Sequence, residues 1–499
     1  MYVLEACQMR EADVMASKEY GLPGIVLMEN AARAVYDYIA KNDYNDIVIV
    51  CGGGNNGGDG FALARLLSVD KYNVRVFCFA DKSRIKGDAA TNLSILDKMG
   101  IDVEHSMEEL AWAIEKCQVV VDSIFGTGFR GQIEGSYKEA VERINSSRKH
   151  VIAVDIPSGI YTDTGAADNV FIKAACTVTF CCKKPGHLLG VGREASGQVF
   201  VKGISMPEKC MLYQKPCITT NDEVYPSEII KKRSIQSHKG DYGRVYIISG
   251  SYHMSGAAAL CAKAALRTGS GLVTCVIPES IIDRVGALVP EATFLTFDEK
   301  TDDKPLNIEK LGTVFNNADA VAIGPGMGTG KVAVELVKEL LEGFKGPVVI
   351  DADGINILAE HRELLEKLNP NTILTPHPGE MSRLTGMPVS SINNERMDTA
   401  RSFARNYGCI LLLKGASTVV SNGTDLYINT SGNPGMATGG SGDVLTGMIA
   451  SLCGQGYNPW DAAVLGSYLH GCAGDAAMGR YGYGFTAGDI AEYIGRTKL

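Results

Sequence analysis

Short apolar runs alternate with amphipathic segments along most of the chain. In the first half, runs rich in valine and isoleucine predict β-strands at residues 46–51, 74–80, 119–122, 150–155 and 176–180. In the second half, similar runs predict strands at residues 245–249, 272–277, 318–323, 347–351, 372–375 and 409–414. Helical patterns separate most of these strands, and such alternation is typical of parallel sheets with crossover helices. The pattern therefore predicts an α/β protein.

The chain is too long for one ordinary hydrophobic core. A length of 499 residues favours two domains. Residues 204–236 contain Pro207, Pro216 and Pro226 but little periodicity, so we place the boundary near residue 215, with domains at 1–215 and 222–499. Before the first strand, residues 15–40 are predicted to be helical with a break at 21–24.

Composition and charge narrow the class of protein. A hydrophobic content of 45% with 21% charged residues is that of a globular protein. The net charge of −9 argues against a surface that binds nucleic acid or membrane. The N-terminal residues lack a signal-peptide pattern, and no apolar run reaches the roughly 20 residues needed to span a bilayer. We therefore expect a cytoplasmic protein.

The cysteine pattern agrees with that compartment. The chain has 14 cysteines, but none are spaced C-x-x-C and many lie inside predicted strands. They are interpreted as small buried side chains in a reducing compartment. A metal site at the vicinal pair Cys181-Cys182 is the weaker alternative.

The glycine-rich run at residues 433–443 is the strongest chemical signal. It leads into an apolar helix predicted at 444–452. Glycines let backbone N–H groups surround an anion, and the helix N-terminus adds partial positive charge. Asp443 ends the run, and a carboxylate beside a phosphate is repelled unless it has a proton to take. This conflict indicates a general base next to a phosphoryl group. The alternative is that Asp443 only caps the helix.

Other loops of the second half also follow predicted strands. They lie at residues 237–243, 250–259, 323–328 and 374–380, and none contains the P-loop pattern. His377 stands between two prolines, so its backbone is rigidly presented. It could contact a ligand or make a structural hydrogen bond. Lys414 ends a predicted strand, where its ammonium could reach a phosphate or simply extend to solvent.

The first half has its own glycine loop at residues 51–60. Gly52, Gly54 and Gly57 satisfy G-x-G-x-x-G, and Asp81 follows the next strand, where a ribose-binding acid would stand. A dinucleotide-dependent oxidoreductase is therefore one alternative. Two features weigh against it: the amides at 55–56, and the charge of Asp59 at the start of the predicted helix 61–67, where a pyrophosphate would lie.

Two more strands of this half end in acids. Asp122 precedes the loop at 123–131, and Asp155 precedes the loop at 156–159. Ligands of open parallel sheets bind beyond the carboxyl ends of the strands, so these loops are expected to surround one crevice. For either acid alone, anchoring its own turn is the simpler interpretation.

The motifs at residues 24–32, 55–59, 122–128 and 155–159 resemble those of NAD(P)H-hydrate epimerases. The resemblance covers about residues 1–215. It implies a Rossmann-like doubly wound sheet, a potassium ion held by Asn56, Asp122 and Ser158, and Asp155 as the acid/base for inverting the hydroxyl-bearing carbon. It also implies that the hydrated nucleotide is bound by Asn55, Asn56, Gly57, Gly58, Asp59, Gly126, Thr127, Gly128, Phe129, Arg130, Gly131, Gln132 and Asp155.

The motifs of the second half, from about residue 221 to 499, resemble ADP-dependent NAD(P)H-hydrate dehydratases, which belong to the ribokinase-like superfamily. The resemblance implies that Asp443 deprotonates the hydroxyl of the hydrated ring as it attacks the terminal phosphoryl of ADP, accompanied by Mg²⁺. The substrate contacts it implies are Ala257, Gly326, His377 and Asp443. The ADP contacts it implies are Lys414, Gly415, Ala416, Ser417, Thr418, Asn433, Gly439, Gly440, Ser441 and Gly442.

Epimerase followed by dehydratase is the order found in bifunctional NAD(P)H-hydrate repair enzymes. The resemblance thus predicts two three-layer α/β domains, the second ribokinase-like, with NADHX, NADPHX and ADP as ligands. It also predicts ADP as phosphoryl donor, K⁺ and Mg²⁺ as cofactors, and a homo-oligomer. A small-molecule kinase of the same superfamily, with an accessory nucleotide-binding domain, is the main alternative. A first half that only binds RNA or protein is another.

Overall fold

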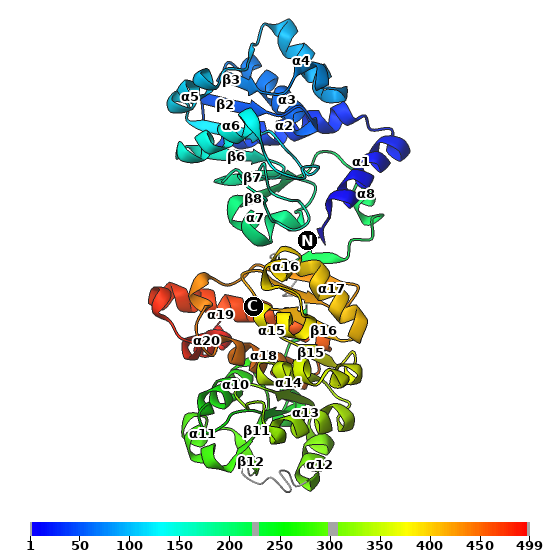
Figure 1. The fold of residues 1–499 in the computed structure, drawn as a ribbon, viewed down its shortest axis with the longest axis vertical. Helices are drawn as coiled ribbons and strands as arrows, with labels where there is room; N and C mark the ends of the chain where they lie inside the picture. The colour runs from blue at the N-terminus through cyan, green and yellow to red at the C-terminus, as the bar shows by residue number, and fades with distance from the viewer. Residues whose placement is uncertain (1, 222–228, 298–307, 497–499) are drawn as a thin grey trace. The chain divides into compact units, whose positions relative to one another are not determined.

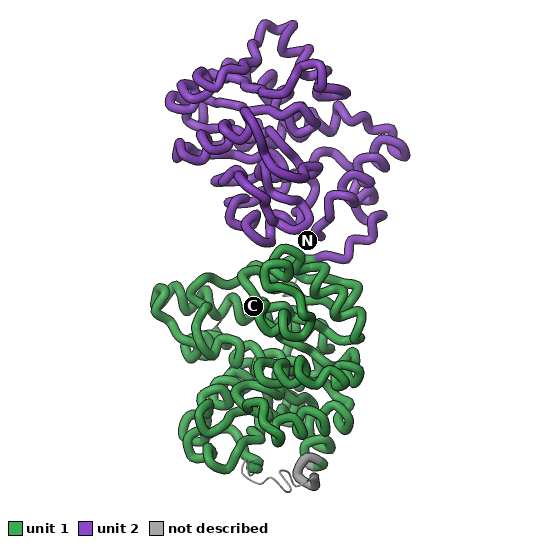
Figure 2. The backbone as a smooth tube through the Cα atoms, in the orientation of Figure 1, with its two compact units in different colours: residues 1, 219–499 green, residues 2–218 purple. Residues whose placement is uncertain are grey.

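The computed structural model describes residues 2–221, 229–297 and 308–496 (Figure 1). Pro226 and the predicted start of the second domain at residue 222 lie outside these ranges. The chain divides into two compact units, one of residues 2–218 and one that begins at Thr219 (Figure 2). None of the helices in the described ranges is long and apolar enough to cross a membrane.

A seven-stranded parallel sheet forms the centre of the first unit. Its strands lie in the order β4-β3-β2-β5-β6-β7-β8. They are β2 (Asp46–Cys51), β3 (Asn73–Cys78), β4 (Val103–Glu104), β5 (Val119–Ser123), β6 (His150–Val154), β7 (Cys176–Phe180) and β8 (Gln198–Lys202). A short strand, β1 (Tyr2–Val3), bridges to Lys183. Predicted strands are confirmed with ends that differ by at most two residues; the edge strands β4 and β8 were not predicted.

Helices cover both faces of this sheet. They are α1 (Ala6–Tyr20), α2 (Gly24–Lys41), α3 (Asn55–Val69), α4 (Gly87–Met99), α5 (Met107–Lys116), α6 (Gly135–Ser146), α7 (Gly190–Ala195) and α8 (Glu208–Leu212). Along β2, Ile47 and Ile49 pack into a core shared with α2, α3 and α4, while Val48 and Val50 pack into a second core with α5 and α6. Successive strand side chains point to opposite faces, so a sheet buried on both sides needs a continuous apolar run.

The second unit is built around a larger, mixed sheet. Its strands lie in the order β9-β18-β17-β16-β15-β14-β13-β10-β11-β12. The pairs from β16 to β12 are parallel, and the hairpin β16-β17-β18 is antiparallel. The strands are β9 (Ile218–Thr220), β10 (Arg244–Ile248), β11 (Leu272–Pro278), β12 (Thr293–Phe297), β13 (Ala320–Ile323), β14 (Val348–Ile350), β15 (Thr372–Leu374), β16 (Ile410–Leu413), β17 (Thr418–Ser421) and β18 (Leu426–Asn429). Strands β9, β12, β17 and β18 were not predicted.

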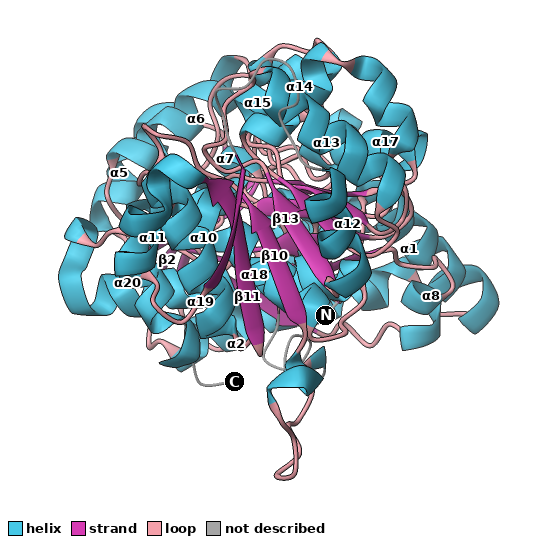
Figure 3. Ribbon diagram, turned by 90° about the horizontal axis from the view of Figure 1, so that it is seen from below, coloured by secondary structure: helices cyan, strands magenta, loops and turns pink. Residues whose placement is uncertain are grey.

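Helices again lie on both faces, as Figure 3 shows around β10, β11 and β13. They are α10 (Ser255–Thr268), α11 (Ile282–Leu288), α12 (Ile308–Asn317), α13 (Lys331–Gly343), α14 (Asp353–Glu360), α15 (Pro378–Thr385), α16 (Val389–Asn394), α17 (Arg396–Tyr407), α18 (Ser441–Gly454), α19 (Pro459–Tyr481) and α20 (Ala487–Tyr493). Helix α18 is buried along nearly its whole length and packs on α10. A Cβ at Gly447 would lie 2.1 Å from the Cys261 carbonyl oxygen, so glycine permits this close packing.

Short 3-10 helices complete the architecture. They are η1 (Lys82–Arg84), η2 (Pro185–His187), η3 (Lys239–Tyr242), η4 (Glu279–Ile281), η5 (Arg362–Lys367), η6 (Pro434–Met436), η7 (Gly482–Gly484) and η8 (Ile494–Arg496). Three helix starts differ from the prediction. The first predicted helix begins at Ala6, α3 begins at Asn55 and α18 begins at Ser441. The last two differences arise because glycine-rich first turns resemble loops in sequence.

Two candidate active sites

The first candidate site begins where β2 leads into α3. A Cβ at Gly52 would lie 1.8 Å from the Ile124 carbonyl oxygen, and one at Gly57 would lie 1.8 Å from the Gly52 carbonyl oxygen. Both positions therefore require glycine. Asn55 and Asn56 belong to the first turn of α3 rather than to the loop. The side chain of Asn56 is buried, and its Nδ2 has no hydrogen-bond partner among the described residues.

The residues implied as potassium ligands lie together. Ser158 donates to Asp122 twice: from Oγ to Oδ1 at 2.6 Å and from the backbone N–H to Oδ2 at 2.8 Å. A Cβ at Gly126 would lie 3.3 Å from Asn56 Oδ1, so Asn56 faces the same loop. Burial raises the pKa of Asp122 to about 6, although the hydrogen bonds from Ser158 oppose this change. A buried carboxylate with a raised pKa favours a nearby positive charge.

Asp155 is held in an ion pair that the sequence did not reveal. Lys184 Nζ lies 2.5 Å from Asp155 Oδ1 and also donates to Thr179 Oγ1 at 2.8 Å. Only 1% of the Lys184 side chain is exposed. Burial opposes ionisation of Asp155, but the Lys184 ammonium outweighs it and holds the pKa of Asp155 below its usual value. The signal that could have found Lys184 is its position just after a strand, at the sheet edge that carries the acids.

A second acid of the predicted epimerase site lies near this ion pair. Burial and the charge of Asp155 raise the pKa of Asp59 well above its usual value. Asp59 in its protonated form can donate a hydrogen bond, whereas Asp155 stays ionised beside Lys184. Two carboxyl groups with opposite pKa shifts are a common arrangement in acid–base catalysis. Asp155 also has a backbone φ of 66°, which is uncommon for a residue with a side chain and is often found at functional sites.

The rest of the first site is arranged around the loop at 123–131. Arg130 is half-exposed and pairs with Asp163 at 3.0 Å, while Thr127 accepts a hydrogen bond from Thr162 Oγ1 through its carbonyl. Phe129 packs on Phe125 with ring centroids 4.9 Å apart. Contact of Arg130 with the hydrated nucleotide stays a prediction. Asp81 is otherwise engaged, because it caps η1 by accepting from Ser83 N–H at 2.9 Å, and this weakens the oxidoreductase alternative.

The second candidate site lies at the N-terminus of α18. Its N-cap is Gly440, with a φ of 88°, and Asp443 is the third residue of the helix. Asp443 is therefore not the capping residue, so the interpretation in which it only caps the helix is wrong. Burial, followed by the charges of Asp351 and Asp353, raises the pKa of Asp443 to about 6, against the opposing effect of Lys414. A carboxylate with this pKa is well suited to accept a proton near neutral pH.

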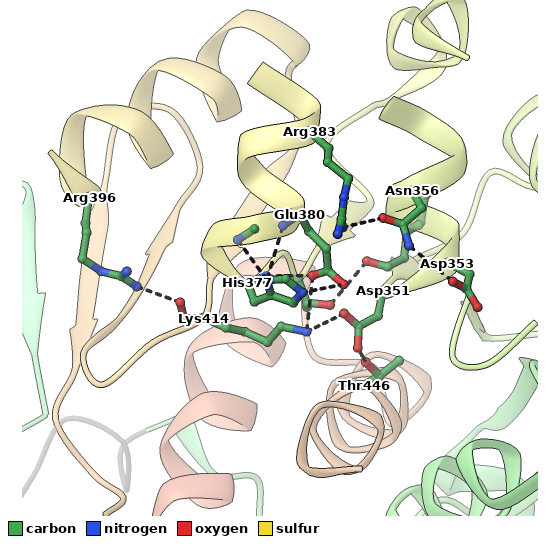
Figure 4. Close-up of polar contacts among 12 residues, drawn as sticks. Asp351, Asp353, Asn356, His377, Glu380, Arg383, Arg396, Lys414 and Thr446 are labelled. Atoms are coloured by element: carbon green, nitrogen blue, oxygen red, sulfur yellow. Dashed lines mark hydrogen bonds and ion pairs between the residues drawn. The ribbon is translucent and has the colours of Figure 1, made fainter. Parts of the chain in front are cut away.

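Lys414 brings a cation to the same helix end. It follows β16, and a Cβ at Gly442 would lie 3.3 Å from its Nζ. Lys414 Nζ pairs with Asp351 Oδ1 at 2.6 Å and lies 3.9 Å from Glu380 Oε2 (Figure 4). Burial lowers the pKa of Lys414, but Asp351 and Glu380 together raise it above its usual value. A charged ammonium beside the N-terminus of a helix favours the binding of an anion.

His377 caps α15. It therefore makes a structural hydrogen bond, which was the alternative to ligand contact. Its Nδ1 accepts from Gly379 N–H at 2.9 Å, and its Nε2 lies 3.4 Å from Glu380 Oε1. Half of the side chain is exposed, so its ring can still contact a ligand. Because Nδ1 accepts, the ring proton of neutral His377 is on Nε2. Ligand contact by His377 stays a prediction.

Two of the predicted substrate residues lie together, and one of the predicted ADP residues already has a hydrogen-bond partner within the protein. A Cβ at Gly326 would lie 2.9 Å from Ala257 Cβ, so these two residues meet across the loop after β13. Arg396, which was not predicted, donates to the carbonyls of Leu413 and Lys414 at 2.9 Å each. It thereby fixes the start of the predicted ADP segment at 414–418. By contrast, the Asn433 side chain is engaged with Asp475 at 2.9 Å.

The fold and these two sites define a class of protein. A Rossmann-like unit and a second α/β unit each place acids and a lysine beyond the carboxyl ends of parallel strands, Lys184 being buried and Lys414 partly buried. A ribokinase-like superfamily protein from Enterococcus faecalis matches 56% of this chain and 94% of its own length, with a TM-score of 0.50 and 27% identity. The chain is therefore a two-domain α/β protein whose second domain has the ribokinase-like fold.

Family comparisons identify both halves. A family model described as NAD(P)H-hydrate dehydratase matches residues 245–496, and one described as YjeF-related protein N-terminus matches residues 24–186. The bifunctional NAD(P)H-hydrate repair enzyme Nnr of Moorella thermoacetica is 40% identical over 509 residues, covering 99% of this chain and 96% of that protein. The Escherichia coli enzyme of the same name is 34% identical over 503 residues, covering 98% and 93%. The chain belongs to the family of bifunctional NAD(P)H-hydrate repair enzymes.

Proposed function

We propose that this protein restores NADH and NADPH from their hydrated forms in two steps, one in each unit. The first unit interconverts the R and S forms of the hydrate, and the second removes the hydroxyl from the S form with ADP, releasing AMP and phosphate. The observation that carries this proposal is the arrangement of Lys414 Nζ beside Gly442, one residue from Asp443 at the start of α18. A cation, a helix N-terminus and a base with a raised pKa then meet at one point.

The chemistry of the second step follows from these groups. Hydroxide is a poor leaving group, so the hydroxyl must first be converted to a better one. Asp443 takes the hydroxyl proton while the oxygen bonds to the terminal phosphorus of ADP and the bond from that phosphorus to AMP breaks. Lys414 and the N–H groups of α18 stabilise the charge on the transferred phosphoryl group. Phosphate then leaves the ring, and loss of a proton from the neighbouring ring carbon restores the double bond.

The first step uses the ion pair of the first unit. Asp155 Oδ1 is oriented by Lys184, and Asp59 lies close enough to respond to its charge. We infer that Asp155 is the acid/base for inverting the hydroxyl-bearing carbon and that the proton it moves is that of the hydroxyl, with Lys184 keeping Asp155 ionised and in place. The loops at 126–132 and 155–159 are proposed to hold the nucleotide.

Potassium fits the residues proposed to bind it. Asn56, Asp122 and Ser158 offer amide, carboxylate and hydroxyl oxygens, which a hard cation prefers to nitrogen or sulfur. The Asn56 ligand would be its amide oxygen, Oδ1, because the Nδ2 that has no partner among the described residues is a donor and does not bind a cation. An ion there would order the loops that these residues belong to. Its positive charge would also offset the buried Asp122 carboxylate.

Magnesium is proposed to accompany ADP. Mg²⁺ in nucleotide sites binds mainly through phosphate oxygens and water, with few protein ligands. No group of three or more His, Cys, Asp or Glu residues in the described ranges could hold a metal ion.

We also propose that the protein forms homo-oligomers, which sedimentation analysis would establish. The kinase alternative has support only at the level of the fold.

The proposed division of labour is tested with Asp443→Ala. We expect this variant to interconvert the R and S hydrates at the wild-type rate and to form no NADH when ADP is added. Chiral chromatography of both epimers, with and without ADP, measures both steps in one assay. NADH formation at the wild-type rate would overturn the role given to Asp443. Net accumulation of a phosphorylated small alcohol from ATP would instead support the kinase alternative.

A further inference from the structure

Asp351 joins two parts of the second site that are far apart in sequence. It directly follows β14 and is 1% exposed. Its Oδ1 accepts from Lys414 Nζ at 2.6 Å, and its Oδ2 accepts from Thr446 Oγ1 at 2.8 Å (Figure 4). Lys414 follows β16 and Thr446 belongs to α18. One carboxylate therefore fixes a strand-end cation to the helix that carries Asp443.

The backbone around Asp351 is held as firmly as its side chain. Its N–H donates to the Ile323 carbonyl at 3.1 Å, and its carbonyl accepts from Gly354 N–H at 3.0 Å. A Cβ at Gly324 would lie 1.9 Å from the Asp351 carbonyl oxygen, so glycine is required for this approach. A side chain on such a support has little freedom, which is what a group that orients others needs.

The turn that follows is strained. Ala352 has φ 47° and ψ −115°, a conformation that residues with a Cβ rarely adopt. This conformation separates the two acids that flank it. Asp351 reaches Lys414 and Thr446, whereas Asp353 accepts from Gly328 N–H at 2.8 Å in the loop that contains Gly326. Two neighbouring carboxylates thus reach the proposed phosphate side and the proposed substrate side of the site.

We propose that Asp351 is a positioning residue of the dehydration step. It holds the Lys414 ammonium against the N-terminus of α18 and keeps the first turns of that helix, with Asp443, aligned to the phosphoryl group that is transferred. Thr446 stands three residues after Asp443, so it lies on the same side of the helix. Asp351 can have this role only if Lys414 and Asp443 act as proposed above.

The charges around Asp443 predict a measurable signature. It is surrounded by Lys414 after β16, Asp351 after β14, Asp353 on α14 and the buried thiol of Cys261 on α10. Beyond burial, Asp351 and Asp353 raise the pKa of Asp443 and Lys414 lowers it. Replacing Asp351 by asparagine removes a negative charge and leaves the charge of Lys414 unbalanced. Both changes lower the pKa of Asp443.

The test compares Asp351→Asn with the wild type in ADP-dependent recovery of NADH from the S hydrate. The wild-type kcat/KM is expected to rise with pH through a midpoint near 6, where Asp443 loses its proton. In the variant this midpoint should fall by about one pH unit, because one neighbouring charge is removed. The KM for ADP should rise and kcat should fall, each by about tenfold, because the phosphate-binding cation is no longer fixed.

Further variants separate positioning from folding. Asp351→Glu keeps the charge but moves the carboxylate, so it should restore the pH midpoint and still raise the KM for ADP. Thr446→Val removes only the link to α18 and should lower kcat without moving the midpoint. Asp398→Asn, at a side chain that is 72% exposed, is the matched control and should behave as the wild type. Circular dichroism and thermal unfolding of each variant report on the folding of the second unit, which epimer interconversion by the first unit does not.

The outcomes are distinguishable. A wild-type pH midpoint and a wild-type KM for ADP in Asp351→Asn, with Asp443→Ala inactive in dehydration, would overturn the positioning role alone. If Asp351→Asn does not fold, a wild-type KM for ADP in Asp351→Glu would overturn it in the same way. If Asp443→Ala still forms NADH at the wild-type rate, the proposed function of the site is overturned, and the positioning role of Asp351 is overturned with it.

Discussion

Lys184 Nζ and Asp155 Oδ1 form an ion pair of 2.5 Å in the first unit, and the lysine is almost completely buried. A buried ammonium is costly unless it is paired and hydrogen-bonded, and here it has the carboxylate, a threonine hydroxyl and a backbone carbonyl. The pair holds the carboxylate ionised and in one orientation. That is the property that the epimerisation step requires of Asp155.

Replacing Lys184 should therefore impair epimerisation more than it impairs dehydration. We expect Lys184→Met to slow interconversion of the R and S hydrates by about 100-fold or more, because Asp155 loses the group that orients it and keeps it ionised. Dehydration of the S hydrate with ADP should be unchanged. The neighbouring Lys183→Met is the matched control and should retain both activities. Equal losses of both activities in Lys184→Met would indicate a general loss of structure instead.

Breaking the same pair from the other side should reduce stability. Asp155→Asn leaves the Lys184 ammonium buried without its counter-ion, which typically costs about 3–5 kcal/mol. The folded-state pKa of Asp155 lies below its usual value, so the stability from its ionised form is present above the unfolded pKa. It is lost as the pH falls through the folded pKa. Urea unfolding of the first unit at pH 7 and at pH 3 should show a deficit in the variant that shrinks at the lower pH.

Potassium should stabilise the first unit through Asp122. Thermal unfolding in potassium chloride should occur several degrees above that in choline chloride at equal ionic strength, since binding to the folded state alone raises stability by about RT ln(1 + [K⁺]/Kd). Asp122→Asn should abolish the difference. Asp168→Asn, at a side chain outside the proposed cation site, should leave it intact. An equal shift in Asp122→Asn and in the wild type would exclude Asp122 as a ligand.

The first turn of α18 should tolerate little added bulk. A Cβ at Gly442 would lie 3.3 Å from Lys414 Nζ and 3.5 Å from Asp351 Oδ2. Gly442→Ala should thus raise the KM for ADP several-fold, by about 1 kcal/mol of lost phosphate binding, with little change in thermal stability. Gly479→Ala, where a Cβ meets no atom within 4 Å, should have a wild-type KM. Steady-state kinetics with varied ADP would distinguish the two.

The sequence predicted the central strands well because each must be apolar on both faces. The strands from β10 to β16 that it predicted were found within two residues of their expected ends. Strands such as β4, with two half-buried residues, have no such pattern. The hairpin β17-β18 was hidden because it begins at the end of the motif at 414–418 and is followed by the glycine-rich run at 433–443. Helices α3 and α18 begin earlier than expected because their first turns are rich in glycine.

The candidate sites were predictable only in part. Acids at strand ends, such as Asp122 and Asp155, could be placed at one edge from topology alone. Their partners could not, because Lys184, Asp351 and Arg396 act through packing between segments that are separate in sequence. Asp351 lies 63 residues from Lys414 and 95 from Thr446. The pattern showed Asp351 only as the end of an apolar strand, and a single sequence carries no record of such pairings.

The central claim is that one chain carries out two successive reactions in two separate units. It is tested most directly by starting from the pure R hydrate with ADP and measuring NADH formed by Asp155→Ala, by Asp443→Ala, and by an equal mixture of the two variants. Asp155→Ala should form NADH no faster than spontaneous epimerisation supplies the S hydrate, and Asp443→Ala should form none. The mixture should restore rapid recovery of NADH. A mixture no faster than Asp155→Ala alone, or NADH formation by Asp443→Ala alone, would contradict the account.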